Sequence, residues 1–410
     1  MRQIRKLLVL RSSDRLAAIF EQGVFSVVAL SQSVLYARSF DSTEFGLFAL
    51  IVSLVLVILG IQRSIIILPM MLSEHNHDGR EDIAWLLLNL IYCVSVSTLL
   101  VVVALIFIAE EGVWRKALIL SAILSPCMLL NEFNRRRLFM QRRPLSAAAA
   151  SVVYAATLLC GLAYTLAFRP EIELAIATWA GAAVVSAVAS TLLANKYSSF
   201  HKISNQRERL LFATWSFLSY LPYAAYNNAT ALILGLVSTI QDVATFATAR
   251  IFITPIIALI QAVDSVDKPA SRRAMSQEGL PGLTKSISSS RYFLLGLGLP
   301  YVLVVLGTSG VLPSLLFPKH GEDLMLPVIL WASVGISMMM AQPSETGLLI
   351  LGESKTVFLL RVLVLLLAAL TFNSFRDGNN VQAAIAGLTI GWASSCALAY
   401  ARLRYLGVKK

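Results

Sequence analysis

Residues 45–72 read FGLFALIVSLVLVILGIQRSIIILPMML, and the only charged residue in this stretch is Arg63. A helix needs about 20 predominantly apolar residues to cross the hydrocarbon core of a bilayer. The stretch is long enough for this, so it predicts a membrane-spanning helix with one charge inside it.

The rest of the chain has the same character. Of its 410 residues, 57% are hydrophobic and 14% are charged, whereas about 25% of residues are charged in a typical soluble domain. This composition excludes a sizeable soluble domain, and with it a pump that carries its own ATPase. The length leaves room for about twelve spans joined by short loops.

Apolar runs bounded by charged or turn-forming residues predict the spans in two sets of six. The first set is expected near 16–36, 45–72, 83–109, 113–132, 145–168 and 172–194. The second set is expected near 210–236, 243–263, 292–316, 324–351, 357–375 and 381–400. Pro126 breaks the pattern of the fourth span, and Pro327 and Pro343 break that of the tenth.

The predicted fold class is an all-α polytopic membrane protein with two six-helix bundles around a central cavity. Residues 1–195 form the N-terminal bundle, 196–209 a basic cytoplasmic linker, and 210–410 the C-terminal bundle. Because each half holds an even number of spans, the halves form a parallel repeat about an axis along the membrane normal.

Lysine and arginine predict the orientation, because cytoplasmic loops hold the excess of both. Most of the 34 fall on one side if the amino terminus is cytoplasmic, including Arg135, Arg136, Arg137 and Arg361. Both termini are then cytoplasmic. The net charge of +11 reflects this topology and attraction to anionic membrane lipid, so nucleic acid is not an expected partner.

Polar residues inside spans are costly and usually face a cavity or a partner. Glu21 and Gln32 share one face of the first span, and the second span carries Arg63 at a depth where it could meet Glu21. Polar residues also recur at helical spacing in the seventh and eighth spans. The predicted substrate-binding residues are Arg63, Arg250, Glu21, Gln32, Tyr220, Tyr223, Asn227, Thr254 and Gln261.

Each of these residues also has a structural interpretation. Arg63 could extend to the inner headgroups, or it could form a structural ion pair with Glu21. Pro222 and Pro255 coincide with the polar faces and predict bends in the seventh and eighth helices. These bends could shape a binding site or only the packing.

Four carboxylates are candidates for coupling transport to H⁺ or Na⁺: Glu21, Asp264, Glu132 and Glu345. No spacing of cysteine or histidine predicts a metal site. We expect no cofactor, and we find no catalytic constellation that would indicate an enzyme.

The stretch LYARSFDSTEFGLFAL at 35–50 and the segment GIQRS at 60–64 resemble the start of the polysaccharide exporters of the multidrug/oligosaccharidyl-lipid/polysaccharide (MOP) superfamily, which include O-antigen flippases. Residues 239–250 resemble the opening of that family's eighth helix, with Ala244 where glycine is expected and Phe246 where tyrosine is expected. Arg250 is similar to an arginine of related flippases.

The resemblance implies a flippase of the bacterial inner membrane, which moves a polyprenyl-pyrophosphate-linked oligosaccharide to the outer leaflet by alternating access. Its other partners would be membrane proteins of polysaccharide assembly. The first alternative is a cation-coupled multidrug exporter of the same superfamily. The second alternative is a membrane-embedded glycan polymerase or ligase, which the short outer loops disfavour.

Overall fold

The computed structural model describes residues 2–72, 82–106, 112–141, 143–168, 171–194, 206–318, 324–375 and 379–408. Every regular element in these ranges is a helix. The chain forms two compact units. Unit 1 is Met1–Gln32 with Leu50–Phe217, and unit 2 is Ser33–Ala49 with Leu218–Lys410.

Unit 1 holds the helices of the first half, except that the connection between α1 and α2 groups with unit 2. These helices are α1 (Arg2–Ser39), α2 (Ser42–Gln62), the π-helix η1 (Arg63–Ile67), α3 (Leu68–Leu72), α4 (Asp82–Ile106), α5 (Val113–Met140), α6 (Pro144–Phe168) and α7 (Ile172–Leu193). α5 packs against both α4 and α7, and α6 packs against α7.

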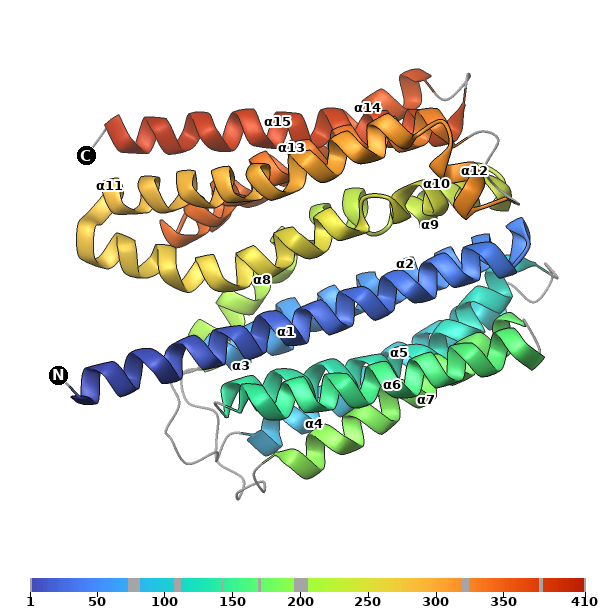
Figure 1. Cartoon of the computed structure of the whole chain (residues 1–410), viewed down its shortest axis with the longest axis horizontal. Helices are drawn as coiled ribbons and strands as arrows, with labels where there is room; N and C mark the ends of the chain where they lie inside the picture. The colour runs from blue at the N-terminus through green and yellow to red at the C-terminus, as the bar shows by residue number, and fades with distance from the viewer. Residues whose placement is uncertain are drawn as a thin grey trace. The chain divides into compact units, whose positions relative to one another are not determined.

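Unit 2 holds the helices of the second half from Leu218 onward. They are α8 (Gln206–Asn227), α9 (Thr230–Val237), α10 (Ile240–Ile251), α11 (Thr254–Thr308), α12 (Leu312–Leu316), α13 (Met325–Ile350), α14 (Ser354–Phe375) and α15 (Asn380–Val408). α15 lies beside α13 and α14 (Figure 1).

The described helices account for the expected spans. Nine of them are long and apolar enough to cross a membrane, and α10 with the first part of α11 makes a tenth, bent by 57°. α1 and α8 are more polar; α1 covers the first expected span, and α8 together with α9 covers the seventh. The all-α polytopic fold class is confirmed.

The fourth span differs from its predicted extent, since α5 continues through Pro126 and past Glu132 to Met140. Proline cannot bond to the carbonyl four residues earlier, and Ser97 of α4 donates to that carbonyl, on Ala122, at 2.7 Å. Because the helix continues, Arg135 lies inside it and is buried, which corrects its expected place in a cytoplasmic loop.

The seventh and eighth spans are interrupted, as the prolines predict for the eighth. α10 ends at Ile251, and α11 starts at Thr254 with Pro255 in its first turn, where proline is well tolerated. The predicted continuous polar face from Arg250 to Asp264 is therefore divided by the bend. The seventh span breaks between α8 and α9, after Asn227 rather than at Pro222.

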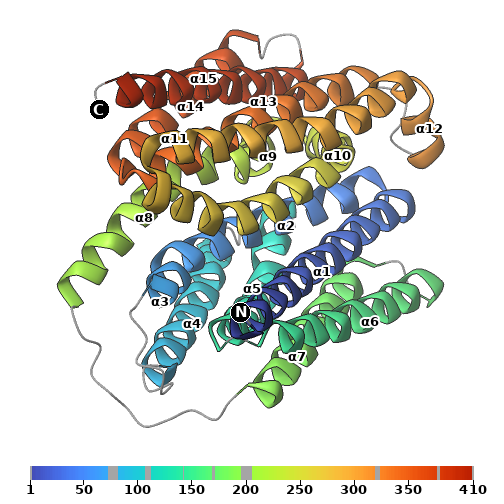
Figure 2. The same cartoon turned by 60° about the vertical axis from the view of Figure 1, so that its left-hand side comes forward.

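α11 is a helical hairpin rather than one rod. Its backbone leaves the helical region at Gly279, where φ is 68°, and the chain reverses there (Figures 1 and 2). Ser271 and Ser286 on the two legs hydrogen-bond at 2.8 Å. The ninth span ends at Thr308, and the short α12 begins at Leu312 with Pro313 in its first turn.

α14 and α15 approach closely at Gly387. A Cβ atom there would lie 2.7 Å from the carbonyl oxygen of Ala368, which is too close for a Cβ atom and a backbone oxygen. The crossing of these two helices therefore requires glycine.

Gly387→Ala is expected to lower the free energy of unfolding by about 1–3 kcal/mol, as overpacking does elsewhere. The matched control is Gly296→Ala in α11, because a Cβ there meets nothing within 4 Å. The control should be neutral or stabilising by less than about 1 kcal/mol. Thermal unfolding in detergent measures both, and equal melting temperatures would contradict the packing described.

Candidate functional site

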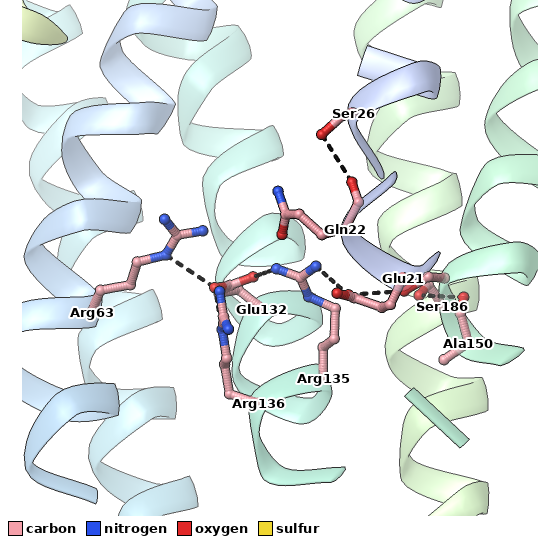
Figure 3. A network of polar contacts seen from close by, with 10 residues as sticks. Glu21, Gln22, Ser26, Arg63, Glu132, Arg135, Arg136, Ala150 and Ser186 are labelled. Atoms are coloured by element: carbon pink, nitrogen blue, oxygen red, sulfur yellow. Dashed lines mark hydrogen bonds and ion pairs between the residues drawn. The ribbon is translucent and has the colours of Figure 1, made fainter. Parts of the chain in front are cut away.

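Unit 1 contains a network of charges centred on Glu132 of α5 (Figure 3). Its Oε1 accepts from Arg63 Nε at 3.0 Å and from Arg136 Nε at 2.9 Å. Its Oε2 accepts from Arg135 Nη2. Arg135 and Arg136 follow Glu132 by three and four residues, so all three side chains lie on one face of the helix.

Arg135 carries the network to α1. Its Nη1 donates to Glu21 Oε1, which also accepts from Ser151 of α6 at 3.1 Å. The guanidinium of Arg135 lies 4.2 Å from the ring centre of Phe25, and Phe25 stacks on Tyr154 of α6. Glu21 and Arg135 are both buried, so each neutralises a charge that would otherwise be costly in the membrane.

The structure corrects the expected meeting of Glu21 and Arg63. Within the described residues, the two side chains are linked through Glu132 and Arg135 rather than directly. Sequence analysis left Arg135 out of the predicted site, because its run of arginines resembles an ordinary cytoplasmic boundary. The spacing of Glu132 from Arg135 was the signal that could have found it.

Unit 2 contains a second buried ion pair. Glu345 Oε2 of α13 accepts from Arg361 of α14 at 2.9 Å, and its Oε1 accepts from Ser395 of α15 at 2.7 Å. Arg361 Nη1 also donates to the carbonyl and hydroxyl oxygens of Ser219 on α8, at 3.1 and 3.2 Å. Four helices therefore meet at this pair, and Arg361 lies inside α14, within the span expected at 357–375.

Aromatic and amide side chains of α8 surround this pair. The Arg361 guanidinium lies 5.0 Å from the ring centre of Tyr223, and Trp392 of α15 packs edge-on against both Tyr223 and Tyr226. Asn227 Nδ2 donates to the Tyr223 hydroxyl at 3.2 Å. Sequence analysis identified Tyr223 and Asn227 but missed Trp392, whose indole nitrogen has no partner among the described residues.

Tyr220 belongs to the same group. Its ring centre lies 6.2 Å from that of Tyr223, and its hydroxyl accepts from Asn228 at 3.3 Å. Arg250, at the end of α10, lies 5.8 Å from the ring centre of Trp331. The structure thus brings Tyr220 and Tyr223 together in unit 2 and places Arg250 beside a different aromatic ring.

The other predicted residues lie apart from these groups. Gln32 is buried in α1, and its side-chain nitrogen has no partner in the part of the chain that the structure describes. Thr254 bonds back to the carbonyl of Arg250 at 3.3 Å, and Gln261 is exposed.

Asp264 lines a small pocket between the legs of α11 and α13, together with Asp267 and Thr346. Thr346 donates to Asp264 at 2.9 Å, and Lys268 pairs with the same carboxylate. Within the described ranges, no group of three His, Cys, Asp or Glu residues could hold a metal ion.

The sequence matches no family profile and no curated protein, but solved structures match it over nearly its full length. A MOP superfamily transporter from Pyrococcus furiosus has a TM-score of 0.69 at 17% identity, over 97% of this chain and 95% of its own. A MATE transporter in complex with MaL6 has a TM-score of 0.69 at 15% identity, over 96% and 94%. A variant of the MATE transporter VcmN from Vibrio cholerae has 0.66 at 14% identity, over 100% and 99%.

The chain has the MATE transporter fold. MATE transporters have twelve membrane helices in two bundles, which is the fold class expected from the sequence. At these identities the likeness establishes the fold, and the substrate has to be argued from the residues.

The buried pair of Glu21 and Arg135 should be strongly coupled. Arg135→Met is expected to lower the free energy of unfolding by about 3–5 kcal/mol, because it leaves the buried Glu21 carboxylate without an ionic partner. Glu21→Gln is expected to cost about 1–3 kcal/mol, because Arg135 keeps its bond to Glu132. The double variant should lose less than the sum, with a coupling energy above about 1 kcal/mol.

The control cycle uses Lys116 and Glu173, whose charged atoms are 2.6 Å apart but whose side chains are 44% and 53% exposed. Its coupling should stay below about 1 kcal/mol. Thermal unfolding in detergent measures both cycles. A coupling no larger for the buried pair than for the exposed one would refute the network's structural role.

Proposed function

We propose that the protein is a transporter that moves an oligosaccharide linked to a polyprenyl diphosphate from the cytoplasmic to the outer leaflet of a bacterial inner membrane. Transport proceeds by alternating access and serves surface polysaccharide biosynthesis. The fold supports transport, and the observation that carries the choice of cargo is the excess of arginine within membrane helices.

The excess is seen by counting the charges in the two networks and at the end of α10. The arginines are Arg63, Arg135, Arg136, Arg250 and Arg361, and the carboxylates are Glu21, Glu132 and Glu345. An unpaired charge costs about 2.5–3.5 kcal/mol at the centre of a bilayer. Surplus guanidinium groups therefore favour an anionic cargo, and guanidinium is well suited to phosphate.

The aromatic group of unit 2 supports the sugar part of the proposal. Tyr220, Tyr223 and Asn227 present rings, hydroxyls and an amide within one cluster, and Gln32 supplies a buried amide nitrogen without a partner in the described part of unit 1. Rings with polar edges suit a sugar, which has both apolar faces and hydroxyl groups. We assign these four side chains to the oligosaccharide, and Arg63 and Arg250 to the diphosphate.

A cation-coupled multidrug exporter is the second candidate, because some structural neighbours are multidrug resistance MATE transporters. Such an exporter would use carboxylates that are free to bind a proton, Na⁺ or a cationic drug. Here Glu21, Glu132, Glu345 and Asp264 are each in an ion pair. The Pyrococcus furiosus neighbour is described as having a binding pocket of reverse polarity that suggests a different function, which supports pocket charge as the criterion.

Arg63→Ala and Arg250→Ala are each expected to lower the delivery of lipid-linked glycan to the outer leaflet by about tenfold or more, the equivalent of one charge-assisted hydrogen bond. Delivery is measured in cells at matched protein abundance. Arg38→Ala is the control, because this arginine is exposed at the end of α1. Unchanged delivery in both variants, or altered drug susceptibility with normal delivery, would favour the exporter.

A further inference from the structure

We propose that Arg63 and Arg136 form a receptor for a phosphate oxyanion in unit 1, in which Glu132 is the counter-charge that orients both guanidinium groups. The ligand class is a phosphate or diphosphate group. Its identification with the headgroup of the transported lipid rests on the proposed function. In addition to Arg63, this assigns Arg136 and Glu132 a role in binding the headgroup.

The hydrogen bonds to Glu132 leave the terminal nitrogens of Arg63 and Arg136 available to bind an anion. Arg63 and Arg136 both approach the same oxygen of Glu132 through Nε, at 3.0 and 2.9 Å. Their terminal nitrogens have no acceptor among the described residues, and those of Arg63 point away from Glu132 (Figure 3). Each terminal nitrogen carries two N–H groups, so the pair offers several donors to one oxyanion.

The side chains of Arg63 and Arg136 are more exposed than those of Glu132 and Arg135. The Arg63 side chain is 49% exposed and that of Arg136 is 28% exposed, whereas Glu132 is 7% and Arg135 is 5% exposed. The carboxylate is therefore set behind the two guanidinium groups that an arriving anion would meet.

The cluster holds one more positive charge than negative charge. Three guanidinium groups face Glu21 and Glu132, and Arg135 is already bonded to both of these carboxylates. One positive charge remains uncompensated, and it falls on the accessible pair Arg63 and Arg136. A phosphate oxyanion would neutralise it with charge-assisted hydrogen bonds.

The backbone at Arg63 is also held in place. The preceding residue, Gln62, is fully buried, and its amide donates to Asn89 at 2.6 Å and to the carbonyl of Leu129 at 2.8 Å. Arg63 then opens the π-helix η1, whose wider turn is confirmed by the bond from the Leu68 N–H to the Arg63 carbonyl. Such π-turns are frequent at functional sites, and this one fixes the direction in which Arg63 leaves the helix.

The test is direct binding to the purified full-length protein in detergent. The probes are inorganic pyrophosphate and farnesyl diphosphate, with farnesol as the uncharged reference. Arg63→Gln and Arg136→Gln are each expected to raise the Kd for both diphosphates about tenfold or more, and the double variant further. Arg272→Gln is the control, because this arginine is exposed in unit 2 and should leave the Kd within about twofold.

Melting temperatures without ligand establish that each variant is folded. If a glutamine variant unfolds, Arg136→Lys replaces it, since lysine keeps the charge but not the planar pair of donors and should still weaken binding. Unchanged affinity in a folded Arg136→Gln protein overturns the receptor, and so does the absence of diphosphate binding to the wild type. Farnesyl diphosphate binding much more tightly than pyrophosphate identifies a lipid headgroup as the ligand, whereas equal affinities identify a free phosphate compound.

The two proposals fail separately. If the Arg63 and Arg136 variants lose diphosphate binding but glycan delivery does not depend on the protein, the receptor stands and the proposed function falls. If delivery depends on Arg63 and Arg250 while Arg136→Gln binds and delivers normally, the function stands and the receptor falls.

Discussion

A charged group in hydrocarbon has no water to replace its lost hydration, so it must find a partner in the protein. Glu132 satisfies this requirement for three arginines, and through Arg135 the pairing reaches Glu21. Residues of α1, α5, α6 and η1 are thus fixed relative to one another at one point inside unit 1. The arrangement is polar where the surrounding contacts are apolar, so it sets the register of these helices in a way that nonspecific packing does not.

Unit 2 also pairs its buried charges, but with a different ratio of arginine to carboxylate. Glu345, like Glu132, lies in the fourth span of its half, and it joins four helices through Arg361, Ser219 and Ser395. In unit 2 one guanidinium group pairs with one carboxylate, whereas in unit 1 three guanidinium groups pair with two carboxylates. Aromatic rings rather than further charges complete the surroundings of Arg361. The two halves therefore share a structural device but differ in the ligand chemistry that each offers.

Hydrophobic length was sufficient to predict the fold class, because a membrane helix has to satisfy its own backbone and span a fixed thickness. Whether a helix continues or ends at a proline depends instead on local interactions. Ser97 satisfies the carbonyl that Pro126 leaves free, so α5 continues, whereas Pro255 starts a new helix after the bend. Arg135 was expected in a loop because charge statistics treat an arginine that follows an apolar run as a loop residue, whereas α5 continues to Met140.

The sharing of carboxylates in unit 1 also constrains how the sequence can change over evolutionary time. Replacing Glu21 alone leaves Arg135 buried with half of its acceptors, and replacing Arg135 alone leaves Glu21 with only the Ser151 hydroxyl. Either intermediate is penalised, so divergence at these sites has to proceed through paired exchanges. Orthologous sequences should accordingly show positions 21 and 135 covarying, with a neutral residue at one accompanied by a neutral residue at the other.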